Sequence, residues 1–153
     1  MTDRIEKSID LKAPQSRVWK ALTDYKEFGA WFRATMDGPF VPGKLSRGKI
    51  AKSACGHEDV CLEAVVQKME PEHYFSFTWH PYSVDPKVDY SAEPSTLVEF
   101  FLERSVKGTL LRVVESGFDK LPAHRRDEAL RMNDRGWGMQ LENILQYAKQ
   151  QAA

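Results

Sequence analysis

The stretch PAHRRDEALRMNDRGWGMQLENILQYAKQQ, residues 122–151, has the apolar periodicity of one long amphipathic helix. Its apolar residues recur mainly at steps of three, four or seven, which places them along one helical face: Leu130, Trp137, Leu141, Ile144, Leu145 and Ala148. Such a face must be buried. Because residues 32–116 have the pattern of strands and turns, we expect a curved antiparallel sheet to wrap this helix.

Two glycines interrupt the helical stretch, Gly136 and Gly138, one on each side of Trp137. A glycine inside a helix costs about 1 kcal/mol relative to alanine, so the pair indicates a close approach by another backbone or by a ligand. The simpler interpretation is that the glycines only let the sheet approach the indole. The sequence leaves both interpretations open.

The segments before this helix alternate between strand and turn patterns, with two short helices near the N-terminus. Period-two alternation marks the strands, and proline, glycine and acidic residues mark their ends. We expect about six to seven antiparallel strands, hence an α+β fold with segregated helices. The expected elements are a strand over Arg4–Leu11, helices over Gln15–Thr23 and Tyr25–Trp31, an extended piece over Phe32–Met36, turns between Asp37 and Gly48, strands over Val60–Met69, Tyr74–His80, Thr96–Arg104 and Thr109–Ser116, and a loop over Pro81–Pro94.

Length and composition indicate a single domain over residues 1–153. The chain has 153 residues, 42% of them hydrophobic, and 22 basic residues balance 22 acidic ones. This balance gives no reason to expect nucleic acid or a membrane surface as partner. No secretory signal or membrane span is visible, so we expect a cytoplasmic protein whose two cysteines, Cys55 and Cys61, are reduced.

Short motifs along most of the chain resemble the SRPBCC superfamily, and more closely bacterial proteins similar to the C-terminal domain of the activator of the heat-shock-protein-90 ATPase. The motifs are mostly structural. They are Ala13-Pro14 through Val18-Trp19-Lys20-Ala21-Leu22-Thr23, Trp31-Phe32, Gly56-His57-Glu58, Glu70-Pro71, Phe77-Thr78-Trp79, Thr96-Leu97-Val98, Glu115-Ser116-Gly117-Phe118 and Gly136-Trp137.

This resemblance implies a helix-grip fold, also called START-like or Bet v 1-like, with an apolar cavity between the sheet and the C-terminal helix. In the eukaryotic activator, stimulation of the chaperone is carried by a separate N-terminal domain. The present chain begins at its first strand, so we expect no such domain here. A homodimer and a chaperone contact stay open as assemblies, and we expect no cofactor.

Three short patterns look like chemical motifs and fail on a required residue. Gly38 to Lys44 matches a phosphate-binding loop, but Leu45 stands where a hydroxyl must meet magnesium, and no helix is expected to follow. The run Cys55, His57 and Cys61 lacks the fourth ligand and the spacing of a structural zinc site. Ser116 lacks the leading glycine of a nucleophile elbow. We therefore expect neither a nucleotide site nor a metal site, and assign no catalytic residue.

Glu115 is the most informative polar residue, because alternation places it on the same strand face as Leu111 and Val113, toward the expected cavity. A carboxylate there has a raised pKa unless a donor meets it. Glu115 is a candidate general base or ligand anchor. Its role could equally be structural, with the carboxylate paired with Arg131, Arg135 or the ring nitrogen of Trp137.

The expected pocket is largely aromatic, in the usual range of about 300–1,000 Å³ with few polar groups. We expect a binding protein for a small hydrophobic or aromatic ligand. The alternatives are a polyketide cyclase-like enzyme that uses Glu115 for proton transfer and a chaperone-associated interaction protein. The candidate ligand-binding residues are Trp31, Phe75, Phe77, Trp79, Phe100, Glu115, Met132 and Trp137.

Overall fold

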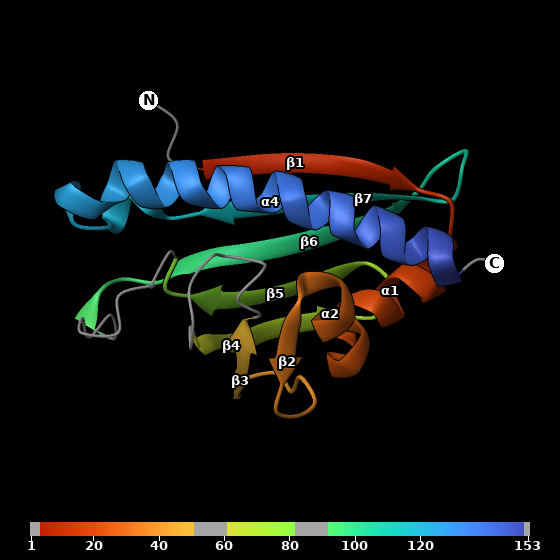
Figure 1. Cartoon of the computed structure of the whole chain (residues 1–153), viewed down its shortest axis with the longest axis horizontal. Coiled ribbons are helices and arrows are strands. Elements are labelled where there is room, and N and C mark those ends of the chain that lie inside the picture. The colour runs from red at the N-terminus through yellow and green to blue at the C-terminus, as the bar shows by residue number, and fades with distance from the viewer. Residues whose placement is uncertain (1–3, 51–60, 82–91, 152–153) are drawn as a thin grey trace.

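The computed structural model describes residues 4–50, 61–81 and 92–151. Within these ranges the chain forms one seven-stranded antiparallel sheet, in the order β1-β7-β6-β5-β4-β3-β2, and three α-helices (Figure 1). This is the predicted α+β helix-grip architecture. The elements in chain order are β1 (Arg4–Leu11), α1 (Gln15–Thr23), α2 (Tyr25–Phe32), β2 (Ala34–Met36), β3 (Leu45–Ile50), β4 (Cys61–Glu70), β5 (Tyr74–Trp79), β6 (Thr96–Arg104), β7 (Thr109–Ser116), the 3-10 helix η2 (Phe118–Lys120) and α4 (Ala123–Gln151).

The two short helices form where the sequence predicts them, and local capping explains the break between them. The Asp24 carboxylate accepts hydrogen bonds from the backbone N–H groups of Lys26 and Glu27 at 2.9 and 3.2 Å, which caps the start of α2. The Trp31 indole donates to the Ala21 carbonyl at 2.7 Å and so joins the two helices. Phe32 was predicted to be extended but belongs to α2, because the helix ends only at its left-handed C-cap, Arg33.

The inner face of the sheet follows the predicted alternation. In β6 the side chains of Val98, Phe100 and Leu102 are buried, and in β7 those of Leu111, Val113 and Glu115 are buried. The prediction of a turn at Gly48 was wrong. This glycine lies inside β3, where a Cβ would approach the Met36 sulfur at 2.6 Å and the Thr35 carbonyl at 2.7 Å. The close packing of β2 on β3 requires a residue without a side chain there.

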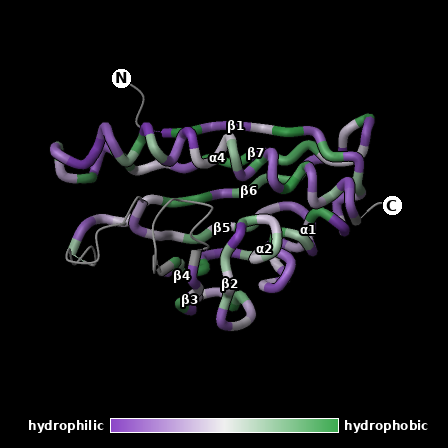
Figure 2. The backbone as a smooth tube through the Cα atoms, in the orientation of Figure 1, coloured by the Kyte–Doolittle hydropathy of each residue, from purple (hydrophilic) through white to green (hydrophobic). Residues whose placement is uncertain are grey.

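The long helix α4 runs along β1 and also contacts α2 (Figure 1). Hydrophilic and hydrophobic residues alternate along it in Figure 2, as expected for a helix that is buried on one side. The buried side consists of Ala129, Trp137, Leu141 and Ile144, while Leu130, Leu145 and Ala148 are half-buried.

Ionic groups fix α4 at both ends. Near its start, the Arg125 guanidinium donates to both Glu93 carboxylate oxygens at 2.8–3.0 Å and to the Pro81 carbonyl at 2.9 Å. Near its end, the Tyr147 hydroxyl donates to the Glu27 carboxylate at 2.7 Å, and Arg17 pairs with the same carboxylate at 2.8 Å. These contacts hold the helix in place over the inner face of the sheet.

The loop that resembles a phosphate-binding loop leads into β3, a strand, so it has no helix N-terminus to offer a phosphate. The expected loop over Pro81–Pro94 falls largely on residues 82–91, outside the described residues. No described helix combines the length and apolar character that crossing a membrane requires.

Of the interpretations of the two α4 glycines, the close approach of another backbone finds no support in the described part of the chain, although sheet residues Trp79, Phe100 and Glu115 do contact the Trp137 indole between them. A Cβ built at Gly136 or Gly138 meets no described atom within 4 Å. Packing inside the described part of the chain therefore does not explain why these two positions lack a side chain.

We expect Gly136→Ala and Gly138→Ala each to raise the free energy of unfolding by about 0.5–1 kcal/mol, because alanine is the better helix former and finds open space at both positions. Urea unfolding at low protein concentration measures this. Gly29→Ala is the matched control in another helix and should destabilise, since its Cβ would collide with the Ala34 carbonyl oxygen. A less stable variant at position 136 or 138 would reveal a contact there.

Candidate functional site

The candidate site is centred on the Glu115 carboxylate, near the end of β7. Glu115 pairs with Val98 of β6, and Thr96 of β6 pairs with Trp79 at the end of β5. The inner-face alternation of these strands turns all three polar side chains toward α4. The helix contributes Asn133 and Trp137, which lie one turn apart and therefore share a face.

Hydrogen-bond donors surround both oxygens of this carboxylate. Oε2 accepts from the Trp79 indole at 2.7 Å, from the Thr96 hydroxyl at 2.6 Å and from the Asn133 amide at 3.2 Å. Oε1 accepts from the Trp137 indole at 2.8 Å and from the same amide nitrogen at 3.0 Å. The cluster joins three strands to the middle of α4.

The donors are neutral, and no described basic side chain pairs with Glu115. An indole N–H and an amide NH₂ can only donate, so they favour the ionised carboxylate. Burial opposes them, because Glu115 is 0% exposed. The site thus places an ionisable carboxyl inside an aromatic core. Hydrogen bonds from neutral donors stabilise its ionised form, and no described counter-ion does.

Burial raises the pKa of the Glu115 carboxyl above its ordinary value of 4.5. The hydrogen bonds from Thr96, Trp79, Trp137 and Asn133 lower it and offset part of that effect. The net direction is upward, so the native state holds the proton of this carboxyl more tightly than an unfolded chain does.

Aromatic rings form the walls around the carboxylate. The Trp79 and Trp137 rings stack with centroids 5.7 Å apart and planes at 29°. Phe32 lies 6.2 Å from each of them, Phe77 lies 5.2 Å from Trp79, and Phe100 lies 5.7 Å from Trp137. Of the two indoles, Trp137 is buried and Trp79 is half-buried.

The structure brings five of the eight predicted site residues together in this cluster: Phe77, Trp79, Phe100, Glu115 and Trp137. Phe75 packs deeper, stacked on Phe100 at 6.0 Å, and Trp31 lies against Phe28 and Phe32 of α2. The Met132 side chain is half-buried on α4 and makes no hydrogen bond or ring contact with the described residues. The ligand-binding role of the eight residues stays a prediction.

Sequence reasoning missed Thr96, Asn133 and Phe32. Thr96 falls on the inner face by the same alternation that placed Glu115 there, so extending the β6 pattern by one residue pair would have found it. Asn133 lies four residues before Trp137, which is a helical neighbour. Of the three partners considered for Glu115, the Trp137 ring nitrogen is the one the structure uses; Arg131 and Arg135 are exposed.

The interior beside Trp137 is occupied by these aromatic rings in the described part of the chain. A cavity of about 10 Å³ lies elsewhere, between α1 and α4, and is lined by Leu11, Ala13, Arg17, Val18, Ala21, Ile144, Tyr147 and Ala148. That volume suits one water molecule. A ligand-sized cavity at Glu115 stays a prediction.

Within the described ranges no group of three or more His, Cys, Asp or Glu side chains is placed to hold a metal ion. Cys55, His57 and the side chain of Cys61, which the sequence singled out, lie outside the described residues.

Comparisons with known proteins identify a family and a fold. The model of the family described as "Activator of Hsp90 ATPase homolog 1-like protein" matches residues 12–149. No curated protein matches the chain. Among solved structures, MLL2253 from Mesorhizobium loti is 23% identical, with a TM-score of 0.75 over 96% of this chain and 97% of that one.

Two further structures share the fold. The Aha1 dimer from Colwellia psychrerythraea is 19% identical, with a TM-score of 0.68 over 95% of this chain and 94% of that one. DynU16, a protein of the dynemicin biosynthetic locus, is 19% identical, with a TM-score of 0.74 over 97% of this chain and 48% of that one. This chain thus spans about half the length of DynU16.

We expect Thr96→Val to lower the free energy of unfolding by about 1.5–3 kcal/mol, because it removes a hydrogen bond to the Glu115 carboxylate with little change in side-chain volume. Urea unfolding measures the loss. The matched control is Thr78→Val on the outer face of β5, which removes only an exposed hydrogen bond from the Gln67 amide at 3.3 Å and should change stability by no more than about 0.5 kcal/mol. Equal effects at the two positions would show that the Thr96 hydroxyl contributes nothing specific.

The raised pKa of Glu115 also predicts a pH dependence. The stability that the bound proton contributes is fully present below pH 4.5 and is lost as pH rises through the native-state pKa. The wild type should therefore lose stability relative to Glu115→Gln as pH rises above 4.5, as measured by urea unfolding at each pH. A relative gain over that range would show that the hydrogen-bond donors outweigh burial.

Proposed function

The chain belongs to the family of Activator of Hsp90 ATPase homolog 1-like proteins, and we propose that it binds a small hydrophobic or aromatic molecule between the sheet and α4. The observation that carries this proposal is the arrangement of stacked aromatic rings around one buried polar cluster, centred on Glu115. Sites for small molecules have this composition, a mostly apolar wall with a few polar groups that fix orientation.

The proposed ligand lies against the Trp79 and Trp137 rings, with Glu115 and its donors orienting a polar group of the ligand. Two members of the cluster, Trp79 and Asn133, are half-buried, and they belong to different elements. Rotation of these side chains would open space beside Trp137 without unfolding a strand. Phe77 and Phe100 would then form the floor, and Met132 would adapt to the shape of the ligand.

A planar aromatic ligand fits this site better than a flexible chain. It can take the place of one indole in the stack and keep the ring-to-ring contacts of about 0.5–1.5 kcal/mol each that the cluster already makes. A donor group on such a ligand could replace the Asn133 amide, which shares one nitrogen between two carboxylate oxygens.

A polyketide cyclase-like enzyme is the second candidate function, and the raised pKa of a buried carboxyl is the observation that favours it. A general base needs a free lone pair, so catalysis would also require Asn133 or Trp79 to release Glu115. Turnover separates the candidates. A bound compound recovered unchanged after long incubation, as judged by mass spectrometry, supports binding alone.

Protein partners are a separate question. The Colwellia protein of this fold is described as a dimer, and we propose that the present chain also self-associates. A chaperone contact is the third candidate. Binding of a purified chaperone to the folded chain in a pull-down would support it.

We expect planar aromatic compounds such as 2-naphthol or anthraquinone to raise the melting temperature and quench tryptophan fluorescence, because two of the four tryptophans stack at the site. The Trp79→Phe variant should weaken binding about tenfold, which corresponds to the loss of roughly one good ring contact. Titration calorimetry measures both affinities.

The control for this titration is Trp19→Phe, a half-buried tryptophan of α1 that contacts Phe75 outside the cluster. Its affinity should equal that of the wild type. If neither planar compounds nor a fatty acid such as lauric acid shift the melting temperature, the aromatic cluster is only a core and the proposal fails.

A further inference from the structure

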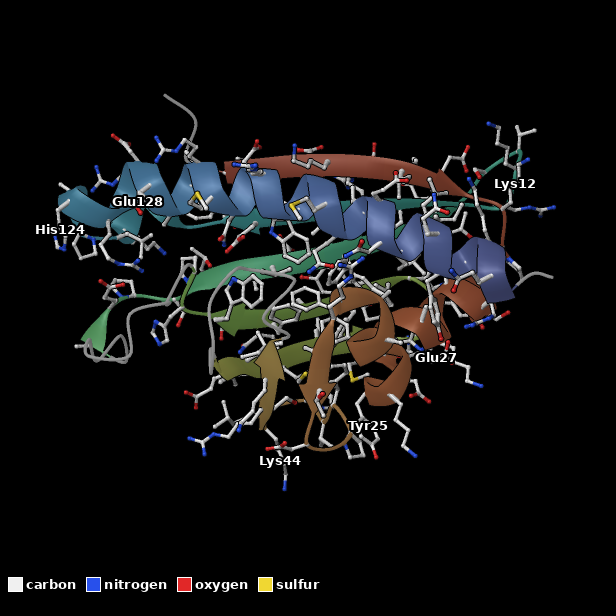
Figure 3. All side chains as sticks on the ribbon, viewed as in Figure 1. Lys12, Tyr25, Glu27, Lys44, His124 and Glu128 are labelled. Atoms are coloured by element: carbon white, nitrogen blue, oxygen red, sulfur yellow. The ribbon has the colours of Figure 1, made fainter. Side chains whose placement is uncertain are left out.

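The side of α4 that faces away from the sheet carries a regular pattern of exposed residues. We call this the outer face, and it consists of Glu128, Arg131, Arg135, Gly138, Met139, Glu142, Gln146 and Lys149. Apart from the adjacent Gly138 and Met139, these positions recur at steps of three or four, so they form one stripe along the helix. Figure 3 labels Glu128 near the start of α4.

The charges of the outer face are complementary to those of a second, antiparallel copy of the same face. Arg135 and Glu142 lie equally far from the midpoint between Gly138 and Met139. Glu128 and Lys149 also lie equally far from that midpoint, again with opposite charges. Arg131 stands opposite the neutral Gln146, so no like charges face each other when the helix is laid antiparallel on a copy of itself.

Among the described residues, 4–50, 61–81 and 92–151, the charged side chains of Glu128, Arg131, Arg135 and Lys149 form no ion pairs. Glu142 accepts a hydrogen bond from Gln146 but likewise pairs with no described basic group. Arg135 and Glu142 are seven residues apart along the helix, and Glu128 and Lys149 are further apart, so neither pair meets within one molecule. Glu128 and Arg131 are three residues apart, but no ion pair between them is found among the described residues.

The centre of the stripe is suited to close approach. Gly138 has open space beyond its Cα, and the next residue, Met139, is 51% exposed and is among the large exposed apolar side chains. A methionine on one helix can therefore fill the space over a glycine on the other. This would give a reason for a glycine that nothing inside the described chain requires.

We propose that the outer face of α4 is the contact of a symmetric dimer, in which a second copy of this chain lies antiparallel with its Gly138 and Met139 at the two-fold axis. Each Arg135 then faces the partner's Glu142, and each Glu128 faces the partner's Lys149. The two-fold symmetry gives two copies of each of these ion pairs. Such an interface is isologous, as two-fold symmetry demands. Because one helix pair buries less than the roughly 1,200 Å² typical of stable complexes, the association is weak and depends on concentration.

Sedimentation velocity of the full chain over about 10 μM to 1 mM tests the proposal. Arg135→Glu places like charges opposite Glu142 at two symmetric points, and Glu142→Arg does the same with the opposite sign. Each should weaken the dimer about tenfold or more. The double variant Arg135→Glu/Glu142→Arg restores both pairs with their signs exchanged and should recover the dimer.

Lys44→Glu provides the matched control. It changes net charge as Arg135→Glu does, at an exposed residue on the loop between β2 and β3, far from α4 (Figure 3). Its dimer affinity should equal that of the wild type. Recovery in the double variant distinguishes direct pairing from a general effect of charge, and circular dichroism verifies that each variant is folded.

Two results would overturn the proposal. A wild type that stays monomeric up to about 1 mM shows that the outer face is only solvated. A dimer that is insensitive to both reversals uses another surface. Neither result bears on ligand binding between sheet and helix, which the titration of Trp79→Phe decides independently.

Discussion

The hydrogen bonds to Glu115 are the constraint on which the rest of the structure depends, because they fix the position of α4 on the sheet. Apolar packing alone is non-directional and would tolerate sliding of the helix along the aromatic surface. Five donor–acceptor contacts from β5, β6 and α4 meet on one carboxylate and allow a single arrangement. The ionic contacts of Glu27 and Arg125 then hold the two ends of the same helix.

Glu115 is therefore a structural group that is also a fully buried ionisable group with a raised pKa. With every donor in place, its oxygens have no free lone pair for a substrate, and the carboxyl cannot act as a base. Any binding or catalysis must first move a half-buried partner, Asn133 or Trp79. Function at this site would thus depend on a rearrangement whose cost is the loss of one or two hydrogen bonds, about 1.5–3 kcal/mol each.

Period-two alternation was sufficient to predict β6, β7 and the inward direction of Glu115, because a strand offers only two faces. The identity of its partners was harder to predict. Asn133 and Trp137 approach Glu115 only through the crossing of α4 over the sheet, and that geometry depends on side-chain volumes that spacing does not encode. The same limit leaves the role of Gly136 and Gly138 undecided by the sequence. The error at Phe32 has a local cause, because α2 continues through Phe32 up to its left-handed C-cap, Arg33.

The order of strands has a further consequence for behaviour at high concentration. The two edges of the sheet are β1 and β2, and an edge strand with free backbone groups is a template for uncontrolled pairing with other chains. Here β2 has only three residues, and β1 carries exposed charged side chains at Arg4, Glu6 and Asp10. Short length at one edge and charge at the other both discourage edge-to-edge growth, so the protein can be concentrated enough for weak, specific contacts to form without fibrous aggregation competing with them.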